Sequence, residues 1–365
     1  MSRPAASLPA PSSGDAAPAG AAARRSGYIV GPVYDAVFFL YAPLLALVLG
    51  IGISRVPAFS AEPVWLAGRP ILPSNLLIGT FIAAHLVLVF LRSHGNRAVF
   101  ARHPLRFTAA PIALFCALLS SIWLSVFVSV LAIWWDVYHS SLQTFGIGRI
   151  YDARAGNDPR AGRRLDVALN LLLYVGPILG GATLVNHLRF FENFERVGDT
   201  FFTAIPAHVT SVHATLTWAA LGLGTPFLGY YVYAYWRLAQ RGYRVSPQKV
   251  FLLASTGLCS IYTWGFNSFG EAFFIMNFFH AWQYFALLWW SEGCSLQRRL
   301  RLDGRALGKP LTLSLFVGLP LAYGALVTAV PTDTNDALFC LAMVVSILHF
   351  WYDGFIWSVR AKQVA

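Results

Sequence analysis

The chain has 365 residues, of which 57% are apolar, 15% are aromatic and only 12% are charged, and its mean hydropathy is +0.58. Ordinary soluble domains carry about a quarter charged residues, so this composition excludes a water-soluble globule of that type. It also excludes a chain that is disordered beyond its tails, because Leu, Val, Phe and Trp are abundant. The net charge of +11 falls in short clusters between long apolar runs, which indicates membrane topology and not nucleic-acid binding.

The first 27 residues are rich in Ala, Pro, Ser and Gly and predict a disordered tail. They contain arginine and few acids, as a cleaved leader would. No short apolar region with a cleavage site precedes the first long apolar run, so we favour the tail. Residues 28–360 are expected to form one transmembrane domain, followed by a short tail over 361–365.

Ten apolar segments are each long enough to cross a bilayer as a helix, which needs about 20 mostly apolar residues. In chain order they cover residues 33–54, 75–92, 107–124, 127–149, 166–186, 211–236, 248–267, 271–291, 311–330 and 336–359. The third and fourth run on without a clear turn. As one helix they would be about 65 Å long, twice a bilayer, so we expect two passes joined tightly. The sequence predicts an all-α, polytopic bundle of ten transmembrane helices.

The positive charges alternate between successive loops in a way that favours ten spans. If the N-terminus is cytoplasmic, the outer segments hold only four of the 27 Lys and Arg residues, namely Arg55, Arg69, Arg189 and Arg196. Cytoplasmic loops carry the excess of Lys and Arg. We therefore predict that both termini lie inside, in a membrane that we expect to be the bacterial cytoplasmic membrane.

The outer segment 188–208 alternates phenylalanines with charged residues. This spacing is typical of an amphipathic helix that lies in the headgroup plane. Two interpretations stay open, a lid over the bundle or a loop packed against it.

Four histidines lie deep inside predicted spans, where ionisable side chains are costly and usually functional. They are His85, His139, His280 and His349. All four spans run from outside to inside in the predicted topology, and the charge that ends each span follows its histidine by seven to twelve residues. At 1.5 Å per residue, the four imidazoles lie in one layer, about 10 to 18 Å from the cytoplasmic edge. The sequence therefore predicts that they converge.

Carboxylates share the helical faces of two of these histidines, because positions three or four apart lie on one face. Asp136 precedes His139 by three residues, and Asp353 follows His349 by four. A ligating imidazole needs its second nitrogen held by a carboxylate or a carbonyl. Asp136 and Asp353 fit that role, and they fit the role of direct ligands equally well.

Further polar residues accompany the four histidines. Tyr138 and Tyr284 are candidate donors of protons or electrons. The same helical faces carry Gln143, Asn277 and Gln283. His94 is a candidate near the inner mouth, and Asp35, just inside the first span, is a further candidate polar contributor.

Imidazole and carboxylate donors without thiolate favour iron, manganese, zinc or copper(II) over copper(I) or an iron–sulfur cluster. The sequence contains no H-E-x-x-H motif and no P-loop, so an intramembrane zinc protease of that type is unsupported. Aromatic residues near the histidines predict an apolar cavity for a lipid-like substrate; they are Trp134, Trp135, Phe278, Phe279, Trp282, Trp351 and Tyr352. A lone membrane histidine is often only an interhelical hydrogen-bonding residue. Four at one depth favour a metal centre.

A compact multi-pass chain whose deep ionisable residues are a few histidines and aspartates resembles the bacterial membrane β-carotene oxygenases related to the bacteriorhodopsin-associated family. The resemblance covers the architecture and the histidine set, not an alignable run of sequence. In that family, intramembrane histidines are thought to hold the iron that activates dioxygen. The resemblance implies that the iron ligands here are His85, His139, His280 and His349.

The leading hypothesis is a membrane-embedded non-haem metal oxidoreductase or oxygenase. Its four histidines would bind iron, its partners would be membrane lipids, a hydrophobic substrate and dioxygen, and it would not bind nucleic acid. Two alternatives stay open. One is a b-type cytochrome whose histidines ligate haem b, and the other is a proton-coupled transporter that uses His and Asp as a relay.

Overall fold

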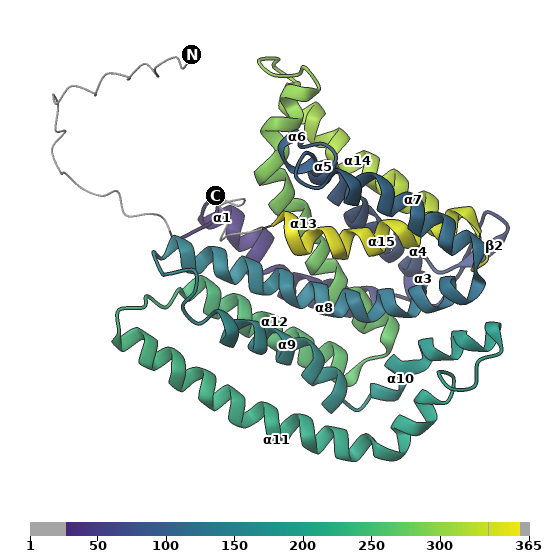
Figure 1. The fold of residues 1–365 in the computed structure, drawn as a ribbon, viewed down its shortest axis with the longest axis horizontal. Helices are drawn as coiled ribbons and strands as arrows, with labels where there is room; N and C mark the ends of the chain where they lie inside the picture. The colour runs from purple at the N-terminus through teal and green to yellow at the C-terminus, as the bar shows by residue number, and fades with distance from the viewer. Residues whose placement is uncertain (1–26, 335, 358–365) are drawn as a thin grey trace, which may run out of the picture.

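The computed structural model describes residues 27–334 and 336–357, of which 79% are helical and 2% lie in strands. The long helices form one bundle (Figure 1), so the all-α prediction is confirmed. Both predicted tails, apart from Gly27, lie outside the described residues.

Each of the ten predicted segments contains a helix in the structure. The first half of the chain forms α1 (Pro32–Asp35), the π-helical η1 (Ala36–Leu40), α2 (Ala42–Ser54), α3 (Pro57–Ser60), α4 (Pro73–Val87), α5 (Val89–Ser93), α6 (Arg97–Phe100), α7 (Pro104–Ser120) and α8 (Ile122–Arg154). A small hairpin of β1 (Val64–Leu66) and β2 (Arg69–Ile71) joins α3 to α4. The second half forms α9 (Arg163–Gly180), α10 (Leu184–Leu188), the 3₁₀ helix η2 (Arg189–Val197), α11 (Ile205–Gln240), α12 (Pro247–Phe266), α13 (Phe269–Arg299), α14 (Gly308–Ala329) and α15 (Ala337–Ile356).

Within residues 27–334 and 336–357, four helical segments are long and apolar enough to cross a membrane. They are the run Pro73–Ser93, which joins α4 and α5, and the helices α8, α14 and α15. Two bent pairs also qualify when each pair is taken as one span. In the first, α1 and η1 meet α2 at 50°; in the second, α9 meets α10 and η2 at 106°. Four to six candidate spans fit an integral membrane protein, while ten spans with both termini inside stay a prediction.

A tight junction between the third and fourth segments is present, but it lies at Ser121, inside the predicted third segment (107–124) and not after it. The backbone of Ser121 is extended, with φ −145° and ψ 109°, and its hydroxyl accepts a hydrogen bond from the Leu124 N–H. This side-chain cap begins α8 directly after α7 ends. The two helices then pack against each other.

Helix α13 is the centre of the bundle, since it packs against α2, α4, α12 and α14 and also contacts α8. Helix α9 lies among α8, α11 and α12, and α11 forms one outer edge of the molecule (Figure 1). Helices α4 and α14 approach closely because Gly324 faces the backbone of Thr80. Small residues allow such backbone contact between membrane helices.

The segment 188–208 is packed against the bundle. Its 3₁₀ helix η2 lies on α8, where Phe194 is buried among Val126 and Val130. The segment therefore forms a short 3₁₀ helix and a turn before α11 instead of one amphipathic helix, and its role as a lid stays a prediction.

Candidate metal centre

The four histidines meet in the interior of the bundle, and each comes from a different helix: α4, α8, α13 and α15. All four are buried, with exposed fractions of 5% or less. The ring centroid of His85 lies 5.0 Å from those of His280 and His349. The centroid of His139 lies 5.0 Å from that of His280 and 4.8 Å from that of His349. The predicted convergence of the imidazoles is present in the structure.

Two of the imidazoles and one carboxylate point their donor atoms at one another. The Nε2 atoms of His139 and His349 are 3.2 Å apart. Asp353 Oδ2 lies 3.7 Å from His139 Nε2 and 3.6 Å from His349 Nε2. Two nitrogens bound to one ion at typical Zn–N distances are about 2.9 Å apart at a right angle and about 3.4 Å apart at the tetrahedral angle. The observed nitrogen separation falls in this interval.

A second group of potential ligands shares His349. His85, His280 and His349 each offer a ring nitrogen, and these nitrogens lie within 4.8 Å of one another, as do the donor atoms of His139, His349 and Asp353. The two overlapping groups together contain all four predicted histidines and one of the predicted aspartates.

Hydrogen bonds fix the orientation of Asp353. Its Oδ1 accepts from the Tyr284 hydroxyl and from the Trp357 indole N–H, each at 3.0 Å. Oδ2, the oxygen nearer the imidazoles, therefore remains available as a ligand. Such outer partners orient the ligands of metal sites.

The tautomer of His349 follows from its backbone partner. Its Nδ1 lies 3.1 Å from the carbonyl oxygen of Leu86. Because a carbonyl only accepts, Nδ1 must carry the proton and donate it. Nε2 then presents its lone pair towards His139 and Asp353, as a neutral ligating imidazole requires.

His280 is buried and, among residues 27–334 and 336–357, neither of its ring nitrogens has a hydrogen-bond partner. The His85 ring is buried beside it, with one nitrogen near the backbone of Ile82. A buried polar atom left unpaired costs about 1–3 kcal/mol, and native structures contain few of them. A neutral imidazole has one lone pair, so a metal ion would satisfy one nitrogen of each ring and remove part of that cost. The donors present therefore fit a metal.

The other predicted site residues are placed away from the imidazoles. The Asp136 carboxylate lies beside Asn277 and Ser140 and lines a neighbouring cavity. Tyr138 is 47% exposed and lines a surface groove with Val175. Consecutive helical residues point about 100° apart, so Tyr138 cannot share the direction of His139. Its predicted role as a proton or electron donor at the site is wrong in this geometry.

The glutamines predicted to share these faces join helices instead of binding at the centre. The Gln143 amide donates to the His280 carbonyl at 2.9 Å and to Gln283 Oε1 at 3.2 Å. The Gln283 amide donates to the carbonyl of Phe39 at 3.0 Å. These bonds tie α8 and η1 to the helix that carries His280.

His94 and Asp35 are held elsewhere. The His94 ring bonds to the Ser93 hydroxyl and to the carbonyl of Phe107. Asp35 accepts three backbone N–H groups of residues 29–31 and the hydroxyl of Tyr151. Asp35 thus stabilises the segment that precedes α1.

The aromatic neighbours of the imidazoles differ from the predicted set. Tyr284 lies 4.8 Å from His349 and Phe350 lies 5.2 Å from His139, between ring centroids. Trp282 donates to the Val37 carbonyl, and the Tyr352 hydroxyl donates to Arg106. These two side chains do not form the predicted wall, because neighbouring positions on a helix face different directions.

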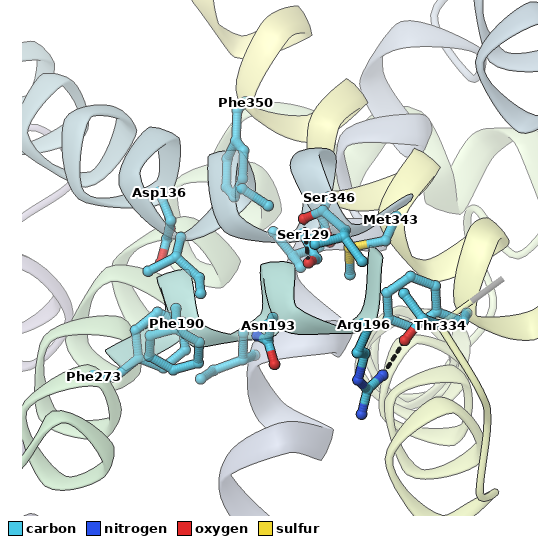
Figure 2. Close-up of a pocket in the computed structure, with 16 residues that line it drawn as sticks. Ser129, Asp136, Phe190, Asn193, Arg196, Phe273, Thr334, Met343, Ser346 and Phe350 are labelled. Carbon is cyan, nitrogen blue, oxygen red and sulfur yellow. Dashed lines mark hydrogen bonds between the residues drawn. The ribbon is translucent and has the colours of Figure 1, made fainter. Parts of the chain in front are cut away.

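An apolar cavity of about 310 Å³ lies next to the centre, enclosed by η2 and by residues of α4, α8, α13 and α15 (Figure 2). Phe350 lines the cavity and also contacts the His139 ring. On the far side, Arg196 of η2 donates to the Thr334 hydroxyl. An apolar cavity is therefore present, with η2 as one of its walls, but none of the seven aromatic residues predicted to wall it is among the residues that line it.

A buried ion pair that the sequence did not reveal supports the centre from one side. Arg92 Nη1 lies 2.8 Å from Glu292 Oε1, and the Arg92 guanidinium lies 4.0 Å from the centroid of the Trp357 ring. Trp357 in turn donates to Asp353. In the sequence, Arg92 and Glu292 each follow an apolar run, where a charge usually marks the end of a membrane span. They lie 200 residues apart, so no local sequence pattern indicates that they pair.

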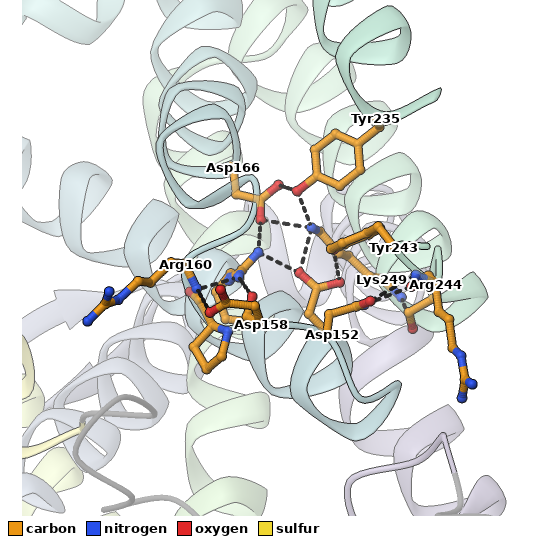
Figure 3. A network of polar contacts seen from close by, with 12 residues as sticks. Asp152, Asp158, Arg160, Asp166, Tyr235, Tyr243, Arg244 and Lys249 are labelled. Carbon is orange, nitrogen blue, oxygen red and sulfur yellow. Dashed lines mark hydrogen bonds and ion pairs between the residues drawn. The ribbon is translucent and has the colours of Figure 1, made fainter. Parts of the chain in front are cut away.

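A second buried network joins α8, α9, α11 and α12 (Figure 3). Arg149 and Lys249 both bind Asp152 and Asp166, at distances of 2.6 to 2.8 Å. Two cations thus balance two carboxylates. Burial, together with the hydrogen bond to Asp152, raises the pKa of the Tyr243 hydroxyl above its ordinary value, so this hydroxyl remains a donor.

Comparison with known proteins does not identify the site, since no protein-family model, curated protein or solved structure matches the chain. The functional assignment therefore rests on the side-chain geometry.

Proposed function

We propose that this protein is an integral membrane, non-haem iron oxidoreductase or oxygenase that acts on a hydrophobic, lipid-like substrate. The observation that carries the proposal is the convergence of four buried imidazoles and the Asp353 carboxylate. Within this set, His139, His349 and Asp353 supply two imidazoles and one carboxylate. That donor set is typical of non-haem Fe(II) oxygenases.

Each ligand has a defined part in this proposal. His139, His349 and Asp353 would hold the ion, and His85 and His280 would complete or border its coordination sphere. Bound iron with an open position would supply the activation of dioxygen. Tyr284 and Trp357 would keep Asp353 Oδ2 turned towards the ion through their bonds to Oδ1.

The apolar cavity supports a hydrophobic substrate. Its walls are mainly hydrophobic side chains, and it adjoins the imidazoles through Phe350. Asp136 is its one carboxylate among the described residues. An apolar cavity excludes water from a reactive site, and it favours the apolar part of a lipid over a polar metabolite.

The compact grouping favours a single ion over haem b, because a macrocycle must lie between its axial ligands, whereas these imidazoles contact one another. Zinc, manganese and copper(II) use the same donors, so metal analysis must decide among them. In the transporter alternative, proteoliposome flux would survive removal of the metal.

Dioxygen uptake tests this function. Protein purified without oxygen and loaded with Fe²⁺ would be mixed with oxygenated buffer, with and without lipid extracted from the source membranes. We expect uptake that needs both iron and lipid and that is lost in His349→Ala. Ser346 lines the cavity, so the larger side chain of Ser346→Phe should fill part of it. This variant should lower the dioxygen uptake that depends on lipid and leave the amount of bound iron unchanged. Uptake that is independent of iron, or equal in all three proteins, would contradict the proposal.

A further inference from the structure

A groove rich in arginine lies between the start of α9 and the last turns of α11. Its volume is about 490 Å³, and five arginines line it: Arg160, Arg163, Arg164, Arg237 and Arg241. No Asp or Glu is among the residues that line it. The groove therefore concentrates positive charge that its own walls do not balance.

The arginines remain available to a ligand. All five are exposed, and within the described part of the chain none of them forms an ion pair with a carboxylate. Like charges gathered around one groove repel one another and raise the local concentration of anions. An anion bound between them would relieve this repulsion.

Buried bonds fix the two walls of the groove. Asp166 of α9 accepts hydrogen bonds from the hydroxyls of Tyr231 and Tyr235 on α11. Gly162, the residue before α9, has φ +68°, and a Cβ there would meet the Tyr235 hydroxyl. The helices thus approach closely, and the groove is built on the network of Figure 3.

The first turn of α9 adds a second attraction for anions. Gly162, Arg163, Arg164 and Leu165 line the groove at the start of this 18-residue helix. The N-terminal end of a helix carries the positive end of its dipole and free backbone N–H groups. Arginine side chains and a helix start together suit phosphate, which accepts bidentate hydrogen bonds from guanidinium.

We propose that this groove binds the phosphate of an anionic phospholipid headgroup. Tyr230 and Tyr233 line it, and tyrosines are enriched at membrane interfaces. Nearby on α11, Val232 and Trp236 are 67% and 55% exposed, which offers an apolar surface for acyl chains. Basic pockets between membrane helices bind such headgroups. A soluble phosphate would use the same chemistry, and the experiment separates the two sources.

Native mass spectrometry of the intact protein, in detergent with added lipid, tests the proposal. The probes are phosphatidylglycerol, phosphatidylcholine and inorganic phosphate. Arg163→Gln combined with Arg237→Gln removes two charges from the groove. Arg298→Gln combined with Arg305→Gln removes two exposed charges at the end of α13 and beyond it, as the matched control. The melting temperature of each variant checks that it is folded. Its bound metal tests the proposed metal centre independently of lipid binding.

We expect the protein to bind phosphatidylglycerol in preference to phosphatidylcholine. At about 1 kcal/mol per basic residue, the groove variant should bind phosphatidylglycerol about 30-fold more weakly, while the control matches the unmodified protein. If inorganic phosphate binds but phosphatidylglycerol does not, the groove is still a phosphate site, but the proposal that a lipid headgroup supplies the phosphate is wrong. Equal binding of both lipids with no bound phosphate, or equal losses in the two variants, would overturn the whole proposal.

Discussion

Removing one hydroxyl that orients Asp353 should weaken metal binding. In Tyr284→Phe, Asp353 Oδ1 loses the donor that lies 3.0 Å away, while the Trp357 N–H stays at the same distance. The carboxylate is then less firmly held, and its Oδ2 spends less time turned towards His139 and His349. Because Tyr284 packs on His349 through its ring, the phenylalanine keeps the apolar contact.

The size of the effect follows from the lost bond. A hydrogen bond to a charged group contributes about 1.5–3 kcal/mol, and altering an outer partner of a metal ligand weakens affinity about 10- to 100-fold. Since Trp357 retains one of the two bonds, we expect the lower end, about tenfold, which corresponds to about 1.4 kcal/mol. Titration of the apoprotein with Zn²⁺ against a competing chelator measures this without redox chemistry.

Tyr352→Phe is the matched control. It also deletes one hydroxyl from a buried tyrosine, whose bond to the Arg106 carbonyl is 2.7 Å long, but that bond does not reach the metal ligands. Its Zn²⁺ affinity should equal that of the unmodified protein. Equal losses in both variants, or no loss in Tyr284→Phe, would refute the assignment of Asp353 as an oriented ligand.

Three further outcomes are expected. Lys249→Met leaves the buried carboxylates with one cation and should lower the free energy of unfolding in micelles by about 3–5 kcal/mol. Adding Asp152→Asn should recover part of this free energy. A double variant as unstable as Lys249→Met alone would contradict the charge-balance argument. Gly324→Ala should lower the melting temperature, because its Cβ meets the backbone of α4, whereas Gly318→Ala on the same helix should not; similar melting temperatures would contradict that close approach. A chelator should lower the melting temperature of the metal-loaded protein by mass action and leave the melting temperature of His349→Ala unchanged. Equal decreases in the two proteins would show that the stabilising metal binds elsewhere.

The convergence of the histidines could be predicted from sequence, because a helix rises by a fixed amount per residue and each histidine lies a similar number of residues from the end of its apolar run. Two residues of α8 illustrate the limit. Depth alone does not determine the rotation of a helix about its axis, so Tyr138 and Asp136 were expected at the centre, yet Tyr138 is exposed and Asp136 faces the cavity. An aromatic neighbour of His139 that was not in the predicted set is Phe350.

The ion pairs between residues far apart in the chain could not be predicted from the sequence, for a different reason. Arg92 and Glu292, or Lys249 and Asp152, lie at the ends of apolar runs, where solvated charges are also common. Only the packing of the helices shows that these charges are buried. Helix positions were predictable from hydropathy, but how many helices cross the membrane depends on packing and tilt that hydropathy does not specify.

Metal analysis of the purified protein tests the central claim most directly. The protein would be equilibrated with Fe²⁺ without oxygen, separated from free metal and analysed by plasma mass spectrometry beside His139→Ala and His349→Ala. We predict about one iron per chain, and at least tenfold weaker binding in each variant. A trace of iron in the unmodified protein, with no uptake of zinc, manganese or copper either, would contradict the account, as would variants that bind iron as tightly as the unmodified protein.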